Sequence, residues 1–195
     1  MTFFDQNTDS FVTIQLLNNE IPTLPFLTAS ETLVKLLDTM GSAFGPVRSD
    51  ISGNIVKLKN RFDQKPNQSQ TLQQLVLAEK AEKGKTATEG LLWLCRALGF
   101  ASLALKMNLA NVADELSVSF TKAYEKTLSK HHNFLIRPIF SLAMNACPAR
   151  AGFYQKLAGG DEPKLMNQLQ DWVNALENQL NILISFYAAQ NLGTI

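Results

Sequence analysis

Residues 49–59 read Ser-Asp-Ile-Ser-Gly-Asn-Ile-Val-Lys-Leu-Lys, a segment in which a polar and an apolar stripe run side by side. On a helix, Asp50, Asn54 and Lys57 stand at i, i+4 and i+7 and therefore stack on one face. The apolar residues form a second stripe about 100° around the helix: Ile51, Ile55, Leu58 and Phe62. The polar stripe could hold a ligand rich in hydroxyl and amide groups, although the spacing is also typical of a solvated helix face.

Outward from this segment, helical periodicity continues through most of the chain and strand signals are scarce. We predict helices over 28–41, 49–63, 70–83, 86–107, 109–130, 132–147, 150–158 and 163–190. Ser49 is expected to cap the second of these helices, and Pro138 to kink the sixth. Because no linker divides the pattern, we expect a single all-α domain over residues 1–195.

The composition of the chain argues against several classes of function. The net charge is +1, so the chain has none of the bulk positive charge on which nucleic-acid binding or firm attachment to anionic membranes depends. Cys95 and Cys147 lack CxxC partners, so we expect no metal site and no redox cofactor. Two isolated cysteines also fit a reducing compartment. The N-terminal residues do not resemble a signal peptide, and we expect that no apolar run approaches the ~18 residues of a membrane span. We therefore expect a cytoplasmic protein.

Two further residues could join the polar stripe in one site. Trp93 shares a helical face with Glu89, Arg96 and Phe100, so it does not stand in a purely apolar stripe. If 124–139 were continuously helical, His132 would fall on the same arc as apolar residues. An indole offers a flat apolar surface and one N–H donor, and an imidazole can donate and accept. Both residues could equally be ordinary core residues.

An enzyme is the weaker interpretation. Asp50, Lys57 and His132 could be arranged as acid and base, but the sequence has no GxSxG, HExxH, GxGxxG or P-loop motif. His131 and His132 are adjacent and would point to different helix faces, which makes a poor metal-binding pair. We expect no catalytic residues and no metal.

The sequence resembles a known family, the glycolipid transfer proteins, over nearly the whole chain. The matching segments are 49–59, Thr71-Leu72-Gln73, Leu92-Trp93-Leu94-Cys95-Arg96, Ala123-Tyr124-Glu125, His132-Asn133-Phe134 and Ala146-Cys147-Pro148. The resemblance implies a two-layer sandwich of eight helices enclosing a hydrophobic lipid pocket. It also implies non-enzymatic transfer of glycosphingolipids between membranes, with only transient contact to the membrane surface.

The resemblance also implies roles for individual residues. Asp50, Asn54 and Lys57 would hydrogen-bond the first sugar, and Trp93 would stack against it. His132, together with Asp50, would hold the ceramide amide.

Some positions depart from the family pattern. Phe134 stands where relatives often have a Trp that docks on the membrane. Glu89 replaces an apolar residue and, like Arg96, could neighbour the head group. The chain ends at Ile195, short of a C-terminal Tyr that covers the head group in some members, so head-group selection could be looser.

The expected hydrophobic pocket combines the apolar stripes with the resemblance. Its candidate lining residues are Phe44, Val47, Phe100, Leu128, Ile136, Phe140, Met144 and Trp172. Three other functions stay open: a ceramide-1-phosphate carrier, a glycolipid sensor and a helical adaptor. Trp93 favours the neutral-sugar branch, since the phosphate branch places a cation at that position.

Overall fold

The computed structural model describes all residues, 1–195, and is built from α-helices. They are α1 (Phe3–Gln6), α2 (Thr23–Asp38), α3 (Gly45–Gln64), α4 (Leu72–Ala81), α5 (Thr86–Ala110), α6 (Leu116–Lys126), α7 (Arg137–Asn145), α8 (Arg150–Ala158) and α9 (Glu162–Gln190). Single 3-10 turns lie between some of them, at 11–13, 42–44, 66–68 and 128–130. The predicted all-α class is confirmed.

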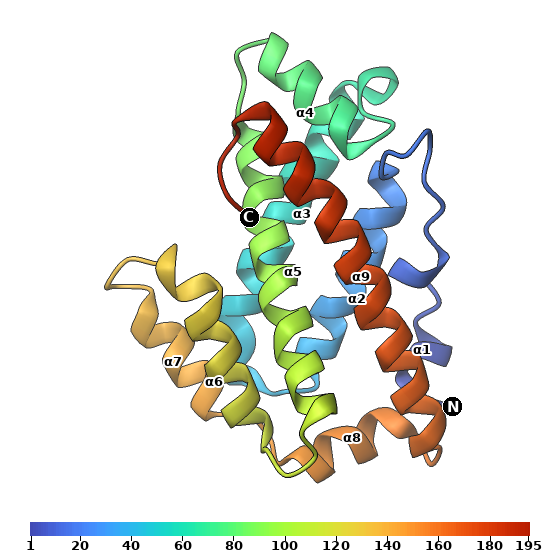
Figure 1. The fold of residues 1–195 in the computed structure, drawn as a ribbon, viewed down its shortest axis with the longest axis vertical. Helices are drawn as coiled ribbons and strands as arrows, with labels where there is room; N and C mark the ends of the chain where they lie inside the picture. The colour runs from blue at the N-terminus through green and yellow to red at the C-terminus, as the bar shows by residue number, and fades with distance from the viewer.

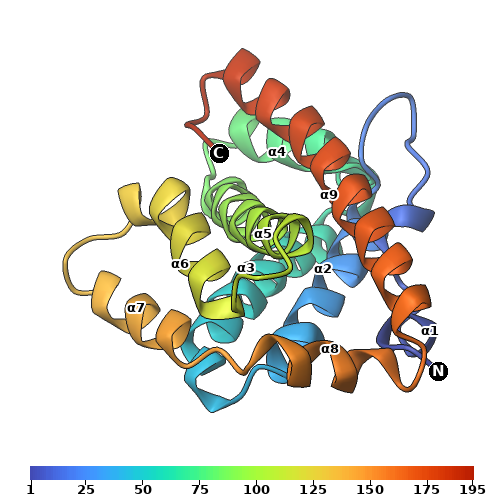
Figure 2. The ribbon, with the colours of Figure 1, turned by 60° about the horizontal axis from the view of Figure 1, so that its bottom comes forward.

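Helix α5 is the centre of the molecule (Figure 1). It packs against α3 on one side and against α6 and α9 on the other, while α2 lies beside α3. The second view shows α2 and α3 as a layer beneath α5, with α6 and α9 flanking α5 (Figure 2). Because α5 is covered from several directions, its sequence is apolar nearly all the way round.

That central position explains why one expectation was wrong. Helix α5 is long and apolar enough to cross a membrane, with a mean hydropathy of 1.4 over 18 residues. In the fold, however, 61% of that window is buried against other helices. The core helix of a globular domain passes the same test of length and composition as a membrane span.

Residues 109–147 form shorter helices, separated by longer turns, than predicted. The expected helix 109–130 is interrupted by a loop at 111–115, where the Asn111 side chain accepts a hydrogen bond from the Ala113 N–H. Helix α6 then ends at Lys126, and the next residue, Thr127, has φ −120° and ψ −86°. The expected helix 132–147 begins only at Arg137. Pro138 therefore lies in the first turn of α7, where a missing N–H costs nothing, and does not kink the helix.

Helix α3 also begins earlier than predicted. It starts at Gly45 with Pro46 in its first turn, so Ser49 lies inside the helix and is not its cap. The early start adds a full turn before Asp50. The polar stripe therefore stands in the middle of a rigid helix and not at a fraying end.

Candidate functional site

One cavity of about 330 Å³ lies between α3, α5, α7 and the segment that precedes α7. Its lining residues are Pro46, Asp50, Asn54, Lys57, Trp93, His132, Ile136, Ile139 and Phe140. The five residues predicted to bind the head group and amide therefore line a single cavity. They come from three separate parts of the chain, with polar side chains on α3 facing aromatic and aliphatic groups.

The polar stripe of α3 is internally connected. Lys57 Nζ donates to Asn54 Oδ1 at 2.9 Å, and Asn54 is almost fully buried. Asp50 lies one turn earlier on α3 and also lines the cavity. Burial raises the pKa of Asp50, and the positive charge of Lys57 partly opposes that rise. An ionised carboxylate at this place is a strong acceptor that lacks a full set of donors.

Sequence reasoning missed Gly90, which brings α5 close to the stripe. A Cβ atom at Gly90 would stand 3.3 Å from Lys57 Cβ and 3.6 Å from the Asn54 carbonyl oxygen. The close approach places Trp93, one turn further along α5, beside the polar stripe. A glycine in the interior of a helix that is otherwise rich in good helix formers was the available signal.

Trp93 is surrounded by cationic and aromatic groups. Its ring centroid lies 5.8 Å from that of His132, with the planes 19° apart, and 6.4 Å from that of His131. The guanidinium carbon of Arg96 lies over the indole, 4.8 Å from the ring centroid. These contacts fix the orientation of the indole while the residue still borders the cavity.

His132 is held by its neighbours and not by a helix. Residues 131–136 form turns, so the continuous helix assumed for 124–139 was wrong. The ring nonetheless meets Tyr124, whose hydroxyl is 3.2 Å from Nδ1, and Phe140, at a centroid distance of 4.4 Å. Burial lowers the pKa of His132, and His131, Arg137 and Arg96 lower it further. A neutral imidazole can accept from Tyr124 and donate from its other nitrogen.

The two possible head-group neighbours lie outside the cavity. Glu89 is exposed and pairs with Lys85 at 3.3 Å. Arg96 turns away from the cavity, and its Nε and Nη2 atoms donate to the Thr194 carbonyl at 2.9 and 2.7 Å. Arg96 therefore acts on the cavity only through its contact with Trp93.

Most of the predicted apolar lining belongs to the packed interior. Ile136 and Phe140 border the cavity, whereas Phe44, Val47, Phe100, Leu128 and Met144 are buried in the core behind it. Phe44 and Phe100 both pack edge-on against Phe120, at 6.1 and 5.8 Å between ring centroids. Trp172 lies elsewhere: it packs against Phe4 and Phe11, and does not line this cavity.

The turn before α7 presents apolar side chains to solvent. Phe134 is 78% exposed and Leu135 is 64% exposed. Leu142, on α7, is 68% exposed. This projecting tip lies at the left edge of the molecule, beyond α6 (Figure 1). His, Cys, Asp and Glu side chains nowhere form a group of three or more that could hold a metal ion.

The fold and this cavity define an all-α protein with a cavity lined both by polar side chains of α3 and by aromatic and aliphatic side chains. The family profile described as "Glycolipid transfer protein (GLTP)" matches residues 21–159. A glycolipid transfer protein of Aureobasidium melanogenum is 50% identical over 190 residues, covering 97% of this chain and 94% of the relative. The chain belongs to the glycolipid transfer protein family.

One other relative and two solved structures are also similar to this chain. Human pleckstrin homology domain-containing family A member 8 is 35% identical; the match covers 98% of this chain but only 39% of that protein. The crystal structure of HET-C2, a fungal glycolipid transfer protein, is 42% identical with a TM-score of 0.91, covering 96% of this chain and 97% of the other. Human ceramide-1-phosphate transfer protein bound to 12:0 ceramide-1-phosphate has a TM-score of 0.83 at 18% identity, with 93% of each chain covered, which shows a shared fold alone.

Proposed function

We propose that this protein binds glycosphingolipids and transfers them between membranes without chemical change. One observation carries the proposal: hydrogen-bonding side chains of α3, an indole and an imidazole line one cavity together with apolar residues such as Ile136 and Phe140. The glycolipid transfer protein from Aureobasidium melanogenum and HET-C2 support the same function.

The chemistry of the cavity suits an amphiphile with a sugar head group. Asp50, Asn54 and Lys57 can exchange hydrogen bonds with sugar hydroxyls, because together they supply both donors and acceptors. Trp93 can stack on the C–H face of the ring. His132, with Tyr124 on its Nδ1 side, can donate from Nε2 to the ceramide amide, whose N–H would go to Asp50.

The ceramide chains need an apolar space, which we place behind Ile136 and Phe140. Each CH₂ removed from water is worth ~0.8 kcal/mol, so a two-chain lipid leaves a bilayer very slowly unless a carrier offers comparable surroundings. In the present structure the aromatic residues there pack against one another. Loading therefore requires these side chains to part, and the lateral position of α7 makes it the helix that gives way.

A ceramide-1-phosphate carrier is the competing function, and the geometry disfavours it. A phosphate monoester carries about −1.5 to −2 charges and calls for several cations. Lys57 is the one Lys or Arg in the cavity lining, and its ammonium already donates to Asn54. Arg96, the other candidate, faces away.

The proposal is tested by transfer of fluorescent galactosylceramide, ceramide-1-phosphate and phosphatidylcholine between donor and acceptor vesicles. We expect selective movement of galactosylceramide. Trp93→Ala should weaken head-group binding by roughly 1–3 kcal/mol, by analogy with base–aromatic stacking, while circular dichroism stays unchanged. Trp93→Phe, which keeps a flat ring, is the matched control and should retain most of the activity.

Three outcomes would contradict this assignment. Preferential ceramide-1-phosphate transfer would move the protein to the phosphate branch. Normal transfer by Trp93→Ala would remove Trp93 from the site. Uptake of galactosylceramide without delivery to acceptor vesicles would indicate a sensor.

We further propose that the protein works in the cytoplasm and contacts membranes through the turn before α7, where Phe134 and Leu135 are exposed. The exposed rings and aliphatic chains there can insert at the interface, while the near-neutral charge keeps binding reversible. Phe134→Ala should slow transfer several-fold with unchanged affinity for lipid in detergent. Phe134→Trp should speed transfer, because an indole prefers the interface. Vesicle co-sedimentation and transfer rates measure both effects, and equal rates for all three proteins would overturn the docking role.

A further inference from the structure

The residues that follow α9, 191–195, fold back against α5 (Figure 1). We call them the C-terminal segment. Gly193 has a φ of +108°, and a Cβ atom there would lie 3.2 Å from Leu92 Cδ2 on α5. One residue further on, the Thr194 carbonyl accepts from Arg96 Nε at 2.9 Å and from Arg96 Nη2 at 2.7 Å. A glycine therefore lets the segment lie close enough to α5 to hold one of its side chains.

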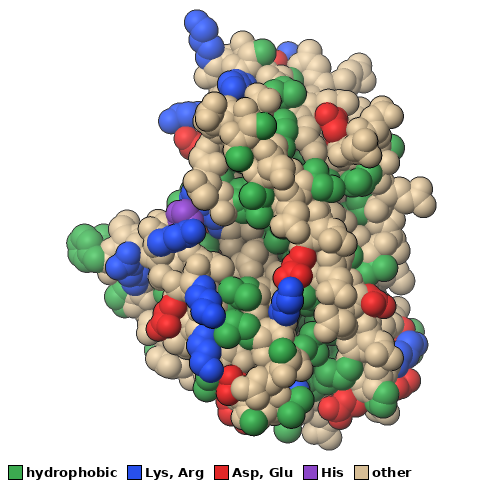
Figure 3. All heavy atoms as spheres, in the orientation of Figure 1, with side chains coloured by type: hydrophobic (Ala, Val, Ile, Leu, Met, Phe, Trp, Pro, Cys, Tyr) green, Lys and Arg blue, Asp and Glu red, His purple; other side chains and the backbone are tan.

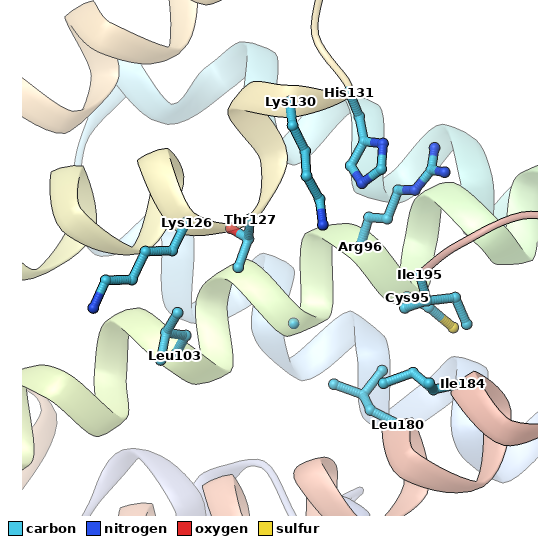
Figure 4. Close-up of a pocket in the computed structure, with 11 residues that line it drawn as sticks. Cys95, Arg96, Leu103, Lys126, Thr127, Lys130, His131, Leu180, Ile184 and Ile195 are labelled. Carbon is cyan, nitrogen blue, oxygen red and sulfur yellow. The ribbon is translucent and has the colours of Figure 1, made fainter.

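The guanidinium of Arg96 has no acidic partner. Arg96 forms none of the ion pairs in the structure. It borders a cavity of about 210 Å³ together with Lys130 and His131, and no Asp or Glu side chain lines that cavity (Figure 4). On the same face of the molecule, Lys, Arg and His side chains gather beside a hollow (Figure 3). The Thr194 carbonyl and the indole of Trp93 are therefore the groups that hold this guanidinium in place.

Arg96 and Trp93 stand three residues apart on α5, so their side chains share a face of the helix. The guanidinium carbon lies 4.8 Å from the centroid of the indole ring. Burial lowers the pKa of Arg96, and a cation–π contact is stronger when the cation is partly removed from water. Trp93 lines the cavity beside the polar stripe of α3, whereas Arg96 does not. The guanidinium thus covers one face of the indole and fixes the orientation in which the remaining surface meets the cavity.

We propose that Arg96 is a positioning residue of the head-group site, held on the indole of Trp93 by the Thr194 carbonyl. An indole that is fixed before the lipid arrives removes an ordering cost from binding, so the sugar should bind more tightly. The C-terminal segment thereby sets the head-group affinity from outside the cavity. This inference rests on the function proposed above, because that function gives Trp93 its contact with the sugar.

Acrylamide quenching of tryptophan fluorescence in the lipid-free protein tests whether Arg96 holds the indole. Trp172 is fully buried and Trp93 is half-buried, so quenching reports mainly on Trp93. Arg96→Ala should raise the quenching constant about twofold, because loss of the guanidinium uncovers one face of the indole. Arg150→Ala is the matched control: it removes a guanidinium that lies 4.7 Å from the ring of Tyr154, and should leave the quenching constant unchanged.

The dissociation constant of fluorescent galactosylceramide tests the consequence for binding. Arg96→Ala should weaken binding about fivefold, as expected for loss of one partly desolvated cation–π contact. In a Trp93→Ala background the same change should have no further effect, because Arg96 acts through the indole. Arg150→Ala should bind galactosylceramide as the unaltered protein does.

A second pair of variants tests the C-terminal segment. Gly193→Val places a β-branched side chain at φ +108° and against Leu92, so the segment should leave α5 and the affinity should fall as far as in Arg96→Ala. Gly160→Val, at φ +95° with open space around it, is the matched control for backbone strain and should bind normally. Thermal unfolding of every variant reports whether the fold survives.

Unchanged quenching in Arg96→Ala, or an equal loss of affinity from this change with and without Trp93, would overturn the positioning role. Unchanged affinity of Gly193→Val would overturn the role of the C-terminal segment. If the unaltered protein binds no galactosylceramide, the function proposed above fails, and the quenching comparison still decides whether Arg96 holds the indole.

Discussion

Asp50 is a cavity-lining residue whose charge is held at a cost to the folded protein. Its carboxylate borders a cavity, is partly removed from water, and faces Lys57 as its nearest compensating charge. Because burial raises its pKa, the charged form is less favourable in the folded state than in the unfolded chain. This cost to stability supports the ligand-binding role that we propose for Asp50.

Replacing Asp50 by Asn should separate stability from function. The free energy of unfolding of the unaltered protein should fall, relative to Asp50→Asn, as the pH rises from the unfolded-state pKa of about 3.9 through the higher folded-state pKa. Asp50→Asn should thus gain relative stability between about pH 4 and pH 7, and should lose about tenfold in glycolipid transfer.

Urea unfolding at both pH values and vesicle transfer measure the two effects. Asp63→Asn, near the exposed end of α3, is the control and should change neither. A variant that transfers normally, or that loses relative stability as the pH rises, would contradict the role given to Asp50.

At the scale of elements, the start of α5 depends on a side chain of α4. Lys85 precedes α5 and provides no side-chain cap. Instead the buried Glu79 accepts from the Ala87 N–H at 2.9 Å, the Thr88 N–H at 2.7 Å and the Thr88 hydroxyl at 2.8 Å. Since α5 carries Trp93 two turns later, this carboxylate fixes the helix that positions the indole.

Glu79→Gln should therefore lower the free energy of unfolding by about 1–3 kcal/mol, since the amide nitrogen cannot accept from buried N–H groups. Glu177→Gln removes only a surface pair with Lys106 and should cost at most about 1 kcal/mol. Denaturant unfolding of the two variants gives the comparison. Similar losses in both would show that Glu79 does not act as the cap of α5.

At the scale of the whole molecule, α7 is the least anchored part of the cavity wall. It buries only Phe140, Ala143 and Met144, whereas α5 is buried along most of its length. Elements with few buried contacts open at lower free energy than the core does. Lipid entry beneath α7 would thus leave the centre of the fold intact.

Hydrogen exchange should reveal this difference. Addition of galactosylceramide should slow exchange of amides in 131–145, because the lipid fills the space against which they pack. Amides in the middle of α5 should be slow with and without lipid. Protection confined to α5, or no change at 131–145, would contradict entry beneath α7.

Sequence reasoning predicted the fold and much of the cavity because periodicity is a local property. The predicted range 150–158 coincides with α8, and Asp50, Asn54 and Lys57 share a helix, so their common face follows from spacing alone. The wrong boundaries fall where turns replace helix, around Asn111 and His132. The spacing of apolar residues in the sequence does not by itself distinguish a helix from a series of turns that bury the same residues.

The sequence by itself determined the all-α class, the polar stripe and the family, because these depend on residues a few positions apart or on the order of motifs. Only the tertiary structure decided which distant groups meet. It directed Arg96 toward Thr194, placed Trp172 against Phe4 and Phe11, and brought Trp93 to the stripe through Gly90. Such contacts depend on how closely helices approach and which way side chains turn, and both are set by packing across the whole core.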